Sequence, residues 1–252
     1  MRRLRRHRVA AILMLLCVGF SSVLWLQPRG ARLQPAEIDR LRLRADNGQD
    51  RVALARLRQV AEHGDLDAQR AIASVQLGRV DKISVIQGLH FAETAARRGD
   101  RAAQYLLGKA LFEGTSAEPA DRAKALPWLQ KSAVQDQPQA AYLLGLMYKN
   151  GYGVAANQIV ASGWFARAAG LGNSDAMFML GNAYLEGVGV AQDQAHALQL
   201  YQAAAALEQP LAAQMLSYAL REGALGLAAD LQQSREMMVE VEHALHHSRA
   251  VF

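Results

Sequence analysis

The chain has 252 residues, of which 51% are hydrophobic and only 6 are proline. Alanine and leucine dominate it, and this composition favours helices over sheets. The formal net charge of +5 comes from residues 1–30, which hold six arginines and no acid, whereas the remainder carries 22 basic and 23 acidic residues. Nucleic-acid binding requires positive charge clustered on the folded part of a protein. The charge balance therefore excludes that class, and we expect no nucleic-acid partner.

The N-terminus carries a membrane-directing pattern. The basic residues 1–8 precede an uncharged run of 18 residues, 9–26. As a helix this run spans roughly 27 Å, which is just enough for a thin hydrocarbon core. Since such arginines stay on the cytoplasmic side, we expect a transmembrane signal anchor: a single pass through the bacterial inner membrane, with the C-terminal domain in the periplasm. The alternative is a soluble periplasmic protein after signal cleavage, with Gly19 and Ser21 as small residues near the cleavage site.

A helical pattern recurs along the rest of the chain at spacings of 35, 37, 36 and 36 residues. Each copy begins with a helix that has an alanine near its start and, five residues later, a second small residue. Small residues at these positions let two helices approach closely, and a helical pair of this kind buries its apolar face only by stacking on neighbouring pairs. The second small residues are Ala73, Gly108, Gly145, Gly181 and Ser217.

A second helix follows each first helix, and its ends are marked in the sequence. Residues that cap a helix N-terminus by accepting a backbone N–H bond recur in the same place, and each contributes about 1 kcal/mol. The predicted caps are Ser84, Asp121, Asn157 and Asp193. Glycines that adopt the left-handed conformation are expected to end these helices, namely Gly64, Gly99 and Gly172. We expect the aromatic residues of the second helices to cover the seam with the next pair.

These landmarks resemble the Sel1-like repeat, a helical-pair relative of the tetratricopeptide repeat. Residues 138–173 carry nearly the whole pattern: Ala140, Leu144-Gly145, Tyr148, Gly151, Gly153-Val154, Asn157, Ala161, Trp164-Phe165, Ala168-Ala169 and Gly172. The resemblance implies an all-α fold, a right-handed α-solenoid of stacked helix-turn-helix repeats. The expected order is a linker at 27–35, a capping helical pair at 36–64, the repeat array at 65–228 and a C-terminal capping helix at 229–252.

Two patterns that suggest chemistry have simpler interpretations. Gly187 and Gly189 resemble a nucleotide-binding loop, but the third glycine of that fingerprint and a preceding strand are missing, so we interpret them as the turn between two helices. His243 and His247, with Glu240 nearby, are the best metal candidate, but a solvated terminal helix explains them more simply. We find no Gly-x-Ser-x-Gly and no His-Glu-x-x-His motif. We therefore expect no enzyme activity, no cofactor and no metal.

The candidate binding residues lie in the first helices, which line the concave side in related repeats. Three residues before the second small residue stands a mostly aromatic ladder, and flanking polar and basic residues follow it by a turn or two. Aromatic and arginine side chains dominate the binding energy of protein interfaces. The predicted protein-binding residues are Arg70, Tyr105, Lys109, Phe112, Tyr142, Lys149, Phe178, Asn182, Gln214 and Arg221.

The resemblance and the anchor together lead to a functional hypothesis. We expect a non-catalytic protein-binding scaffold that serves as an adaptor in a complex of the cell envelope. The same architecture suits an immunity protein that neutralises an antibacterial secreted effector such as a phospholipase, and the sequence does not separate the two roles. A cell-wall hydrolase is the third alternative, and it would require polar residues converging in one pocket.

Overall fold

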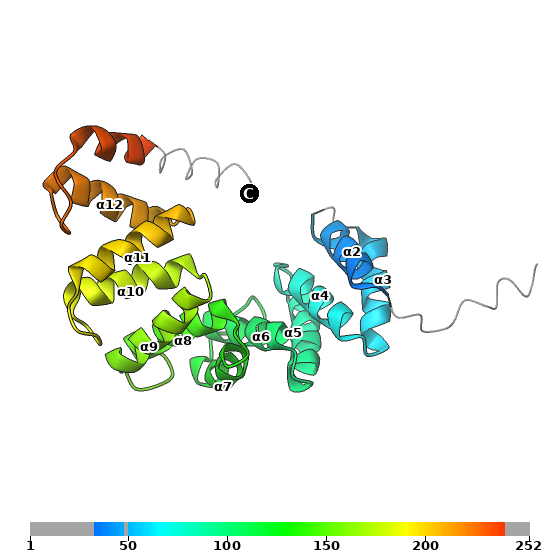
Figure 1. The fold of residues 1–252 in the computed structure, drawn as a ribbon. Coiled ribbons are helices and arrows are strands. Elements are labelled where there is room, and N and C mark those ends of the chain that lie inside the picture. The colour runs from blue at the N-terminus through cyan, green and yellow to red at the C-terminus, as the bar shows by residue number, and fades with distance from the viewer. Residues whose placement is uncertain (1–32, 48–49, 240–252) are drawn as a thin grey trace, which may run out of the picture. The chain divides into compact units, whose positions relative to one another are not determined.

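The computed structural model describes residues 33–47 and 50–239, and this part of the chain contains helices and turns but no strand (Figure 1). The expected all-α fold is confirmed. The predicted transmembrane segment, residues 9–26, lies outside the described residues. Among the helices that are described, none is both long and apolar enough to cross a membrane.

The chain divides into two compact units, residues 1–71 and 72–252, and the boundary falls within helix α4 (Leu66–Leu77). The first unit contains the helical pair α2 (Pro35–Asn47) and α3 (Arg51–Glu62). Asp50 caps α3 by accepting hydrogen bonds from the backbone N–H groups of Val52 and Ala53 at 2.9 and 3.0 Å. Arg44 of α2 also binds this carboxylate at 2.6 Å, which ties the two helices together.

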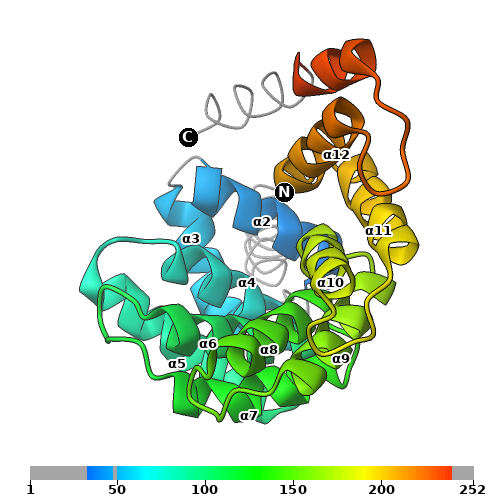
Figure 2. The same cartoon turned by 90° about the vertical axis from the view of Figure 1, so that its left-hand side faces the viewer.

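The second unit is a stack of helical pairs. Its helices are α5 (Lys82–Arg97), α6 (Arg101–Glu113), α7 (Arg122–Ala133), α8 (Pro138–Asn150), α9 (Gln158–Gly170), α10 (Ser174–Glu186), α11 (Gln194–Ala206) and α12 (Pro210–Glu222). Residues 231–239 are also helical. Each helix packs on the next one along the chain. Within this unit α8, α10 and α12 lie on the inner side of the curved stack, and α7, α9 and α11 lie on the outer side (Figure 2).

The small residues of the first helices are contact points for the second helix of the same pair. A Cβ atom added at Gly108 would lie 2.8 Å from the side chain of Leu129, and one at Gly181 would lie 2.7 Å from the ring of Tyr201. At Gly145 it would overlap the ring of Phe165. Close approach within a pair is thus confirmed. Leu129, Phe165 and Tyr201 each fill the space above the glycine of their own pair. Phe165 also shares a core cluster with Leu180, and Tyr201 shares one with Leu216, so both aromatic residues also lie in a cluster that includes the next pair.

The glycine turn that connects the two helices of a pair also contacts the preceding pair. Gly153 and Gly189 have φ angles of 70° and 74°, and each rests on the first turn of the preceding second helix. A Cβ at Gly153 would lie 2.6 Å from the backbone carbon of Arg122, and one at Gly189 would overlap the backbone of Gln158. The interpretation of Gly187 and Gly189 as a turn is confirmed, since Gly187 caps the C-terminus of α10.

Three of the four predicted caps are confirmed. Asp121, Asn157 and Asp193 each accept a hydrogen bond from the backbone N–H three residues on, at 2.9 to 3.1 Å. The prediction for Ser84 is wrong, because Asp81 caps α5 and accepts from the N–H of Ser84 at 2.8 Å. The reason is that this connection lacks the Gly-x-Gly-Val turn, so the second helix begins sooner after the first.

The predicted glycine ends are confirmed at Gly64, Gly99 and Gly172, whose φ angles are 88°, 91° and 86°. In the other two repeats Asp136 and Glu208 take this place, each with a φ of 60°. Side chains with a Cβ are disfavoured in this conformation, at a cost of roughly 1–2 kcal/mol. These two residues are therefore points of local backbone strain.

At the C-terminal end of the array, a pair of serine hydrogen bonds joins α12 to the helix that follows it. The hydroxyl of Ser217 donates to the carbonyl of Ser234 at 2.9 Å, and the hydroxyl of Ser234 donates to the carbonyl of Ser217 at 2.9 Å. Both serines are buried. This reciprocal pair fixes residues 231–239 against α12.

Candidate functional site

The predicted ladder lies on the first helices of the second unit, with one exception. Arg70 belongs to the first unit, where its guanidinium forms an ion pair with Asp67 at 2.6 Å. The other nine residues lie on α6, α8, α10 and α12. We define the inner face as the side chains three before, one after and four after the small residue of each of these four helices. All twelve positions are partly or fully exposed. Those beyond the predicted nine are Leu146, Leu185 and Tyr218.

The aromatic ladder is half-buried, and rings of the second helices support two of its members. The ring of Tyr142 packs against Phe165 with 6.0 Å between centroids, and the ring of Phe178 packs against Tyr201 at 5.8 Å. Tyr105 packs at the margin of the central core cluster. Burial raises the pKa of Tyr105 and Tyr142, and the carboxylates of Glu113 and Asp175 raise them further. Both phenols therefore remain protonated at neutral pH and can donate hydrogen bonds.

The predicted basic flank is largely neutralised by acids on the same helices. Lys109 lies 3.9 Å from Glu113, and Arg221 pairs with Glu222 at 2.8 Å. The guanidinium of Arg221 also lies 5.4 Å from the ring centroid of Tyr218. Lys149 is exposed at the end of α8. The inner face is thus mixed in charge, with aromatic and polar groups side by side.

Phe112 belongs to a second cluster at the turn edge. Its ring lies 6.1 Å from that of Tyr152, and the guanidinium of Arg122 lies 4.2 Å from the Tyr152 centroid and 5.4 Å from the Phe112 centroid. Such stacking of an arginine on aromatic rings is stabilising by about 0.5–2 kcal/mol. Phe112 therefore packs between two repeats, and sequence reasoning missed its partners Tyr152 and Arg122.

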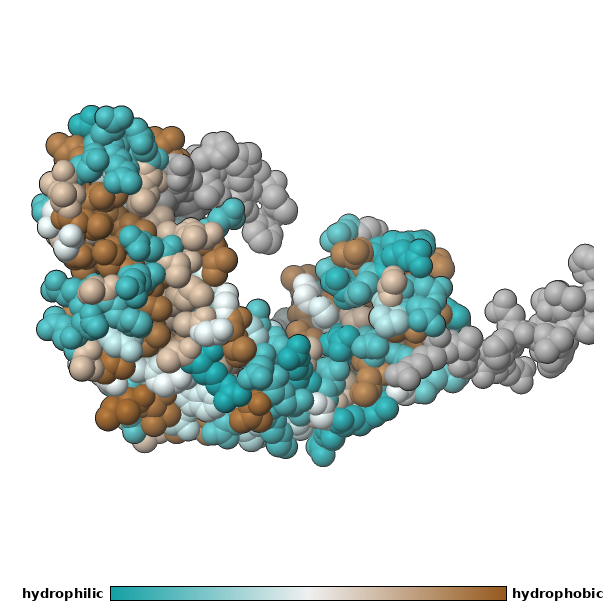
Figure 3. Space-filling view, viewed as in Figure 1, coloured by the Kyte–Doolittle hydropathy of each residue, from teal (hydrophilic) through white to brown (hydrophobic). Residues whose placement is uncertain are grey.

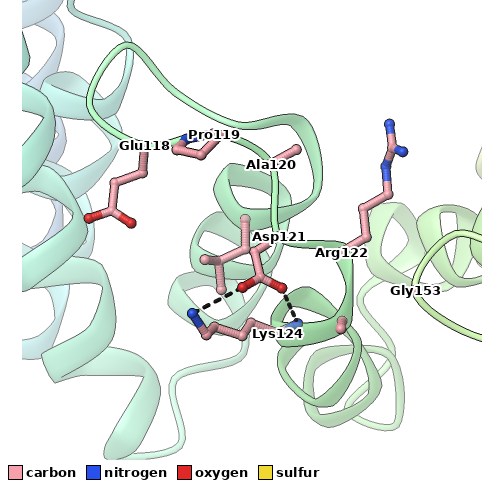
Figure 4. Close-up of a pocket in the computed structure, with 9 residues that line it drawn as sticks. Glu118, Pro119, Ala120, Asp121, Arg122, Lys124 and Gly153 are labelled. Atoms are coloured by element: carbon pink, nitrogen blue, oxygen red, sulfur yellow. Dashed lines mark hydrogen bonds and ion pairs between the residues drawn. The ribbon is translucent and has the colours of Figure 1, made fainter.

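An open pocket of about 470 Å³ lies beside this cluster, in the turn between α6 and α7 (Figure 4). Two carboxylates line it, Glu118 and Asp121. Asp121 caps α7 and pairs with Lys124 at 3.0 Å. The hydrogen bond from the backbone N–H of Lys124 is the main reason why the pKa of Asp121 lies below its ordinary value. Within this pocket Asp121 is thus engaged in helix capping and Lys124 in the ion pair with it.

Asn182 is tied to the second helix of its own pair. The hydroxyl of Tyr201 donates a hydrogen bond to its Oδ1 at 2.7 Å. Sequence reasoning selected Asn182 but missed Tyr201. Tyr218, which is 52% exposed, and Leu146 and Leu185 were also missed. The repeat register could have found them, because Leu146 and Tyr218 occupy the position of Asn182 in their repeats.

Two further features concern apolar surface and metals. Apolar side chains gather where α11 and α12 stack (Figure 3), and Leu207 and Leu211 of this region are each about half exposed.

No group of three or more potential metal ligands occurs among the residues that the structure describes. The metal candidate of Glu240, His243 and His247 lies outside them.

The comparisons with known proteins agree with this architecture. The Sel1 repeat model matches residues 101–136, 138–173, 174–208 and 210–238, more than half of the chain. A Sel1 repeat protein from Oxalobacter formigenes is similar in structure, with a TM-score of 0.75, 24% identity, and coverage of 88% of this chain and 92% of that one. A protective antigen of uropathogenic Escherichia coli strains with an SLR fold has a TM-score of 0.69 and 28% identity over 83% of this chain, which spans only 45% of that antigen. No curated protein matches the sequence.

Proposed function

Because the chain belongs to the Sel1 repeat family, we propose that it is a non-catalytic scaffold that binds a protein partner through the inner face of its second unit. The family fold is suited to protein–protein interaction, and the repeats bring equivalent side chains of successive pairs into register. The role that we propose is that of an adaptor in an envelope complex, held at the inner membrane by residues 9–26 and facing the periplasm.

The observation that carries this proposal is the state of the aromatic ladder. Tyr142 and Phe178 each expose part of a ring whose other side packs on a ring of the second helix. A side chain held in this way loses little conformational freedom when a partner binds, and pre-organised aromatic groups are the residues that contribute most at interfaces. The mixed charge of the face suits a protein surface better than a nucleic acid.

Affinity capture tests the binding role. Tagged full-length protein is purified in detergent from its host, together with a Tyr105→Ala, Tyr142→Ala, Phe178→Ala variant. The control carries three substitutions of exposed residues on the second helices or at their ends: Val134→Ala, Ile159→Ala and Gln202→Ala. We expect a stoichiometric partner that is retained by the control and lost by the inner-face variant, with both variants folded by circular dichroism. A partner retained by the inner-face variant would place the site elsewhere.

The location and the role need separate measurements. A C-terminal alkaline phosphatase fusion is active only in the periplasm, and N-terminal sequencing of the purified protein distinguishes a signal anchor from a cleaved signal. The identity of the captured partner distinguishes an adaptor from an immunity protein. A toxic effector as partner, with protection of a susceptible strain by the wild type but not by the inner-face variant, would replace the adaptor role with the immunity role.

A further inference from the structure

The outer helix α9 turns apolar side chains toward solvent. Ile159 and Val160 in its first turn are 73% and 36% exposed, and Leu171 directly after its last turn is 37% exposed. Soluble surfaces carry a charge at about a quarter to a third of their positions, whereas Arg167 is the one charged residue among the 13 of this helix. A contiguous apolar surface of this kind marks a place where a protein meets a partner or a membrane.

The apolar surface continues onto the end of α7. The guanidinium of Arg167 donates hydrogen bonds to the carbonyl of Val134 at 3.2 Å and to Asp136 at 2.8 Å, so the ends of the two helices adjoin. The side chain of Val134 is 60% exposed. One turn earlier, the ammonium of Lys131 lies 4.7 Å from the ring centroid of Trp128. We define the outer patch as the exposed side of α9 together with Lys131 and Val134.

Charge and aromatic content favour lipid as the molecule that covers this patch. Helices α7 and α9 contain four basic residues and no acidic one. Two acids at the helix ends, Asp121 and Asp136, pair with two of the basic residues, which leaves an excess of two positive charges. Trp128 and Trp164 are partly exposed beside the aliphatic side chains. Indole rings, aliphatic groups and cations are the combination that settles at a membrane–water interface, and anionic headgroups attract the cations.

The length of the N-terminal chain keeps a membrane within reach of the folded part. The proposed membrane segment ends at residue 26, and α2 begins at Pro35. The residues between them extend over at most about 30 Å. If residues 9–26 lie in the bilayer, the first helix of the fold therefore starts close to the lipid headgroups.

We propose that the outer patch binds an anionic lipid surface, with α9 lying in the plane of the headgroups. This inference rests on the part of the proposed function that places residues 9–26 in the membrane. Helices α8 and α10 lie on the opposite side of the same stack (Figure 2). An outer patch on the membrane thus directs the inner face away from it, where a protein partner has access.

The three tryptophans of the chain make the test possible, because two of them belong to α7 and α9 and the third, Trp25, lies in the proposed membrane segment. Full-length Trp25→Phe protein is reconstituted into vesicles of equal amounts of phosphatidylethanolamine and phosphatidylglycerol, and separately into phosphatidylcholine vesicles. Each preparation is made with and without lipid brominated on the upper part of the acyl chain. Bromine quenches tryptophan emission only at close range, so the signal reports Trp128 and Trp164.

Two variants in the Trp25→Phe background separate the patch from a general effect of charge. Ile159→Glu places a carboxylate in the centre of the lipid contact. It stands in the first turn of α9, where an acid interacts favourably with the helix dipole, so the fold is retained. Ala195→Glu is the matched control, since Ala195 is exposed and holds the same position in α11.

We expect brominated lipid to lower the emission in anionic vesicles by about half, because an interfacial helix buries its apolar side roughly 5–10 Å deep. The quenching should disappear in the Ile159→Glu variant and persist in the Ala195→Glu variant. In phosphatidylcholine vesicles it should be clearly weaker, since the attraction to anionic headgroups is absent. Flotation of the vesicles in a density gradient reports the anchor independently of the quenching.

Four results would overturn the inference. They are unquenched emission in anionic vesicles, equal quenching of the Ile159→Glu variant and its parent, equal quenching in both kinds of vesicle, and emission that is blue-shifted but not quenched. The last result would show that a protein, such as a second copy of this chain, covers the patch instead of lipid. Protein that floats without quenching would leave the proposed tether intact, whereas protein that does not float would contradict the tether as well.

Discussion

The glycine of each first helix gives the sharpest test of how the pairs pack. Gly145→Ala adds a Cβ that would overlap the Phe165 ring, itself only 2% exposed. Overpacking of this kind costs about 1–3 kcal/mol, and the gain in helix propensity from glycine to alanine returns up to about 1 kcal/mol. We expect a net loss of roughly 1–2 kcal/mol, since the ring is enclosed and must move together with α9.

Gly163 provides the matched control. It lies within α9 of the same repeat, is exposed, and a Cβ added there would meet nothing within 4 Å. Gly163→Ala should therefore stabilise the protein by about 0.5–1 kcal/mol through propensity alone. In a Phe165→Ala background, where the ring is absent, Gly145→Ala should also become neutral or stabilising.

The assay is urea-induced unfolding followed by circular dichroism at the helical band, with the midpoint compared among the four variants and the wild type. Opposite signs for Gly145→Ala and Gly163→Ala, and the change of sign in the Phe165→Ala background, are the expected pattern. A Gly145→Ala protein at least as stable as the wild type would show that the two helices of a pair separate easily, and the packing argument would fail.

Three further predictions concern helix ends and ionisation. Glu208→Gly should stabilise the protein by about 1 kcal/mol, because glycine adopts the positive φ without strain. Thermal unfolding measures this change. A loss of stability would show that the side chain of Glu208 makes a stabilising contact. Asp81→Ala should cost about 1 kcal/mol in the same assay, and Ser84→Ala should cost clearly less. Tyr201 has a folded-state pKa of about 12 against an ordinary 10.0. The stability that its neutral form contributes is therefore complete below pH 10.0 and is lost as pH rises toward about 12. Tyr201→Phe should reduce this loss of stability at alkaline pH, measured by unfolding at a series of pH values.

The sequence predicted the features that act locally. Asp121, Asn157 and Asp193 bond to backbone groups three residues away, and a glycine after a helix acts on its own φ angle, so both signals are readable in a single stretch of chain. Ser84 failed because the cap position depends on the length of the preceding connection. The landmark of the repeat, applied at a fixed offset, placed the cap three residues too late.

The candidate site was less predictable because its properties arise from residues distant in the chain. Spacing placed Phe112 and Asn182 on the first helices. It did not show that Phe112 packs with Tyr152 and Arg122, or that Asn182 accepts a hydrogen bond from Tyr201. The partial exposure of Tyr142 depends on Phe165, 23 residues later. An alternation of small and bulky residues indicates that two helices pack, but which ring lies over which glycine follows only from the three-dimensional structure.

The turn glycines have a consequence for how such a chain changes in length. Gly189 rests on the first turn of α9, and Gly153 rests in the same manner on the first turn of α7. If residues 138–173 were removed, the turn of Gly189 would meet the start of α7, which already accommodates a glycine turn of the same kind. Insertion or loss of a whole repeat therefore preserves the contacts between the repeats on either side of it. Recombination can lengthen or shorten the array in whole repeats without first requiring compensating mutations.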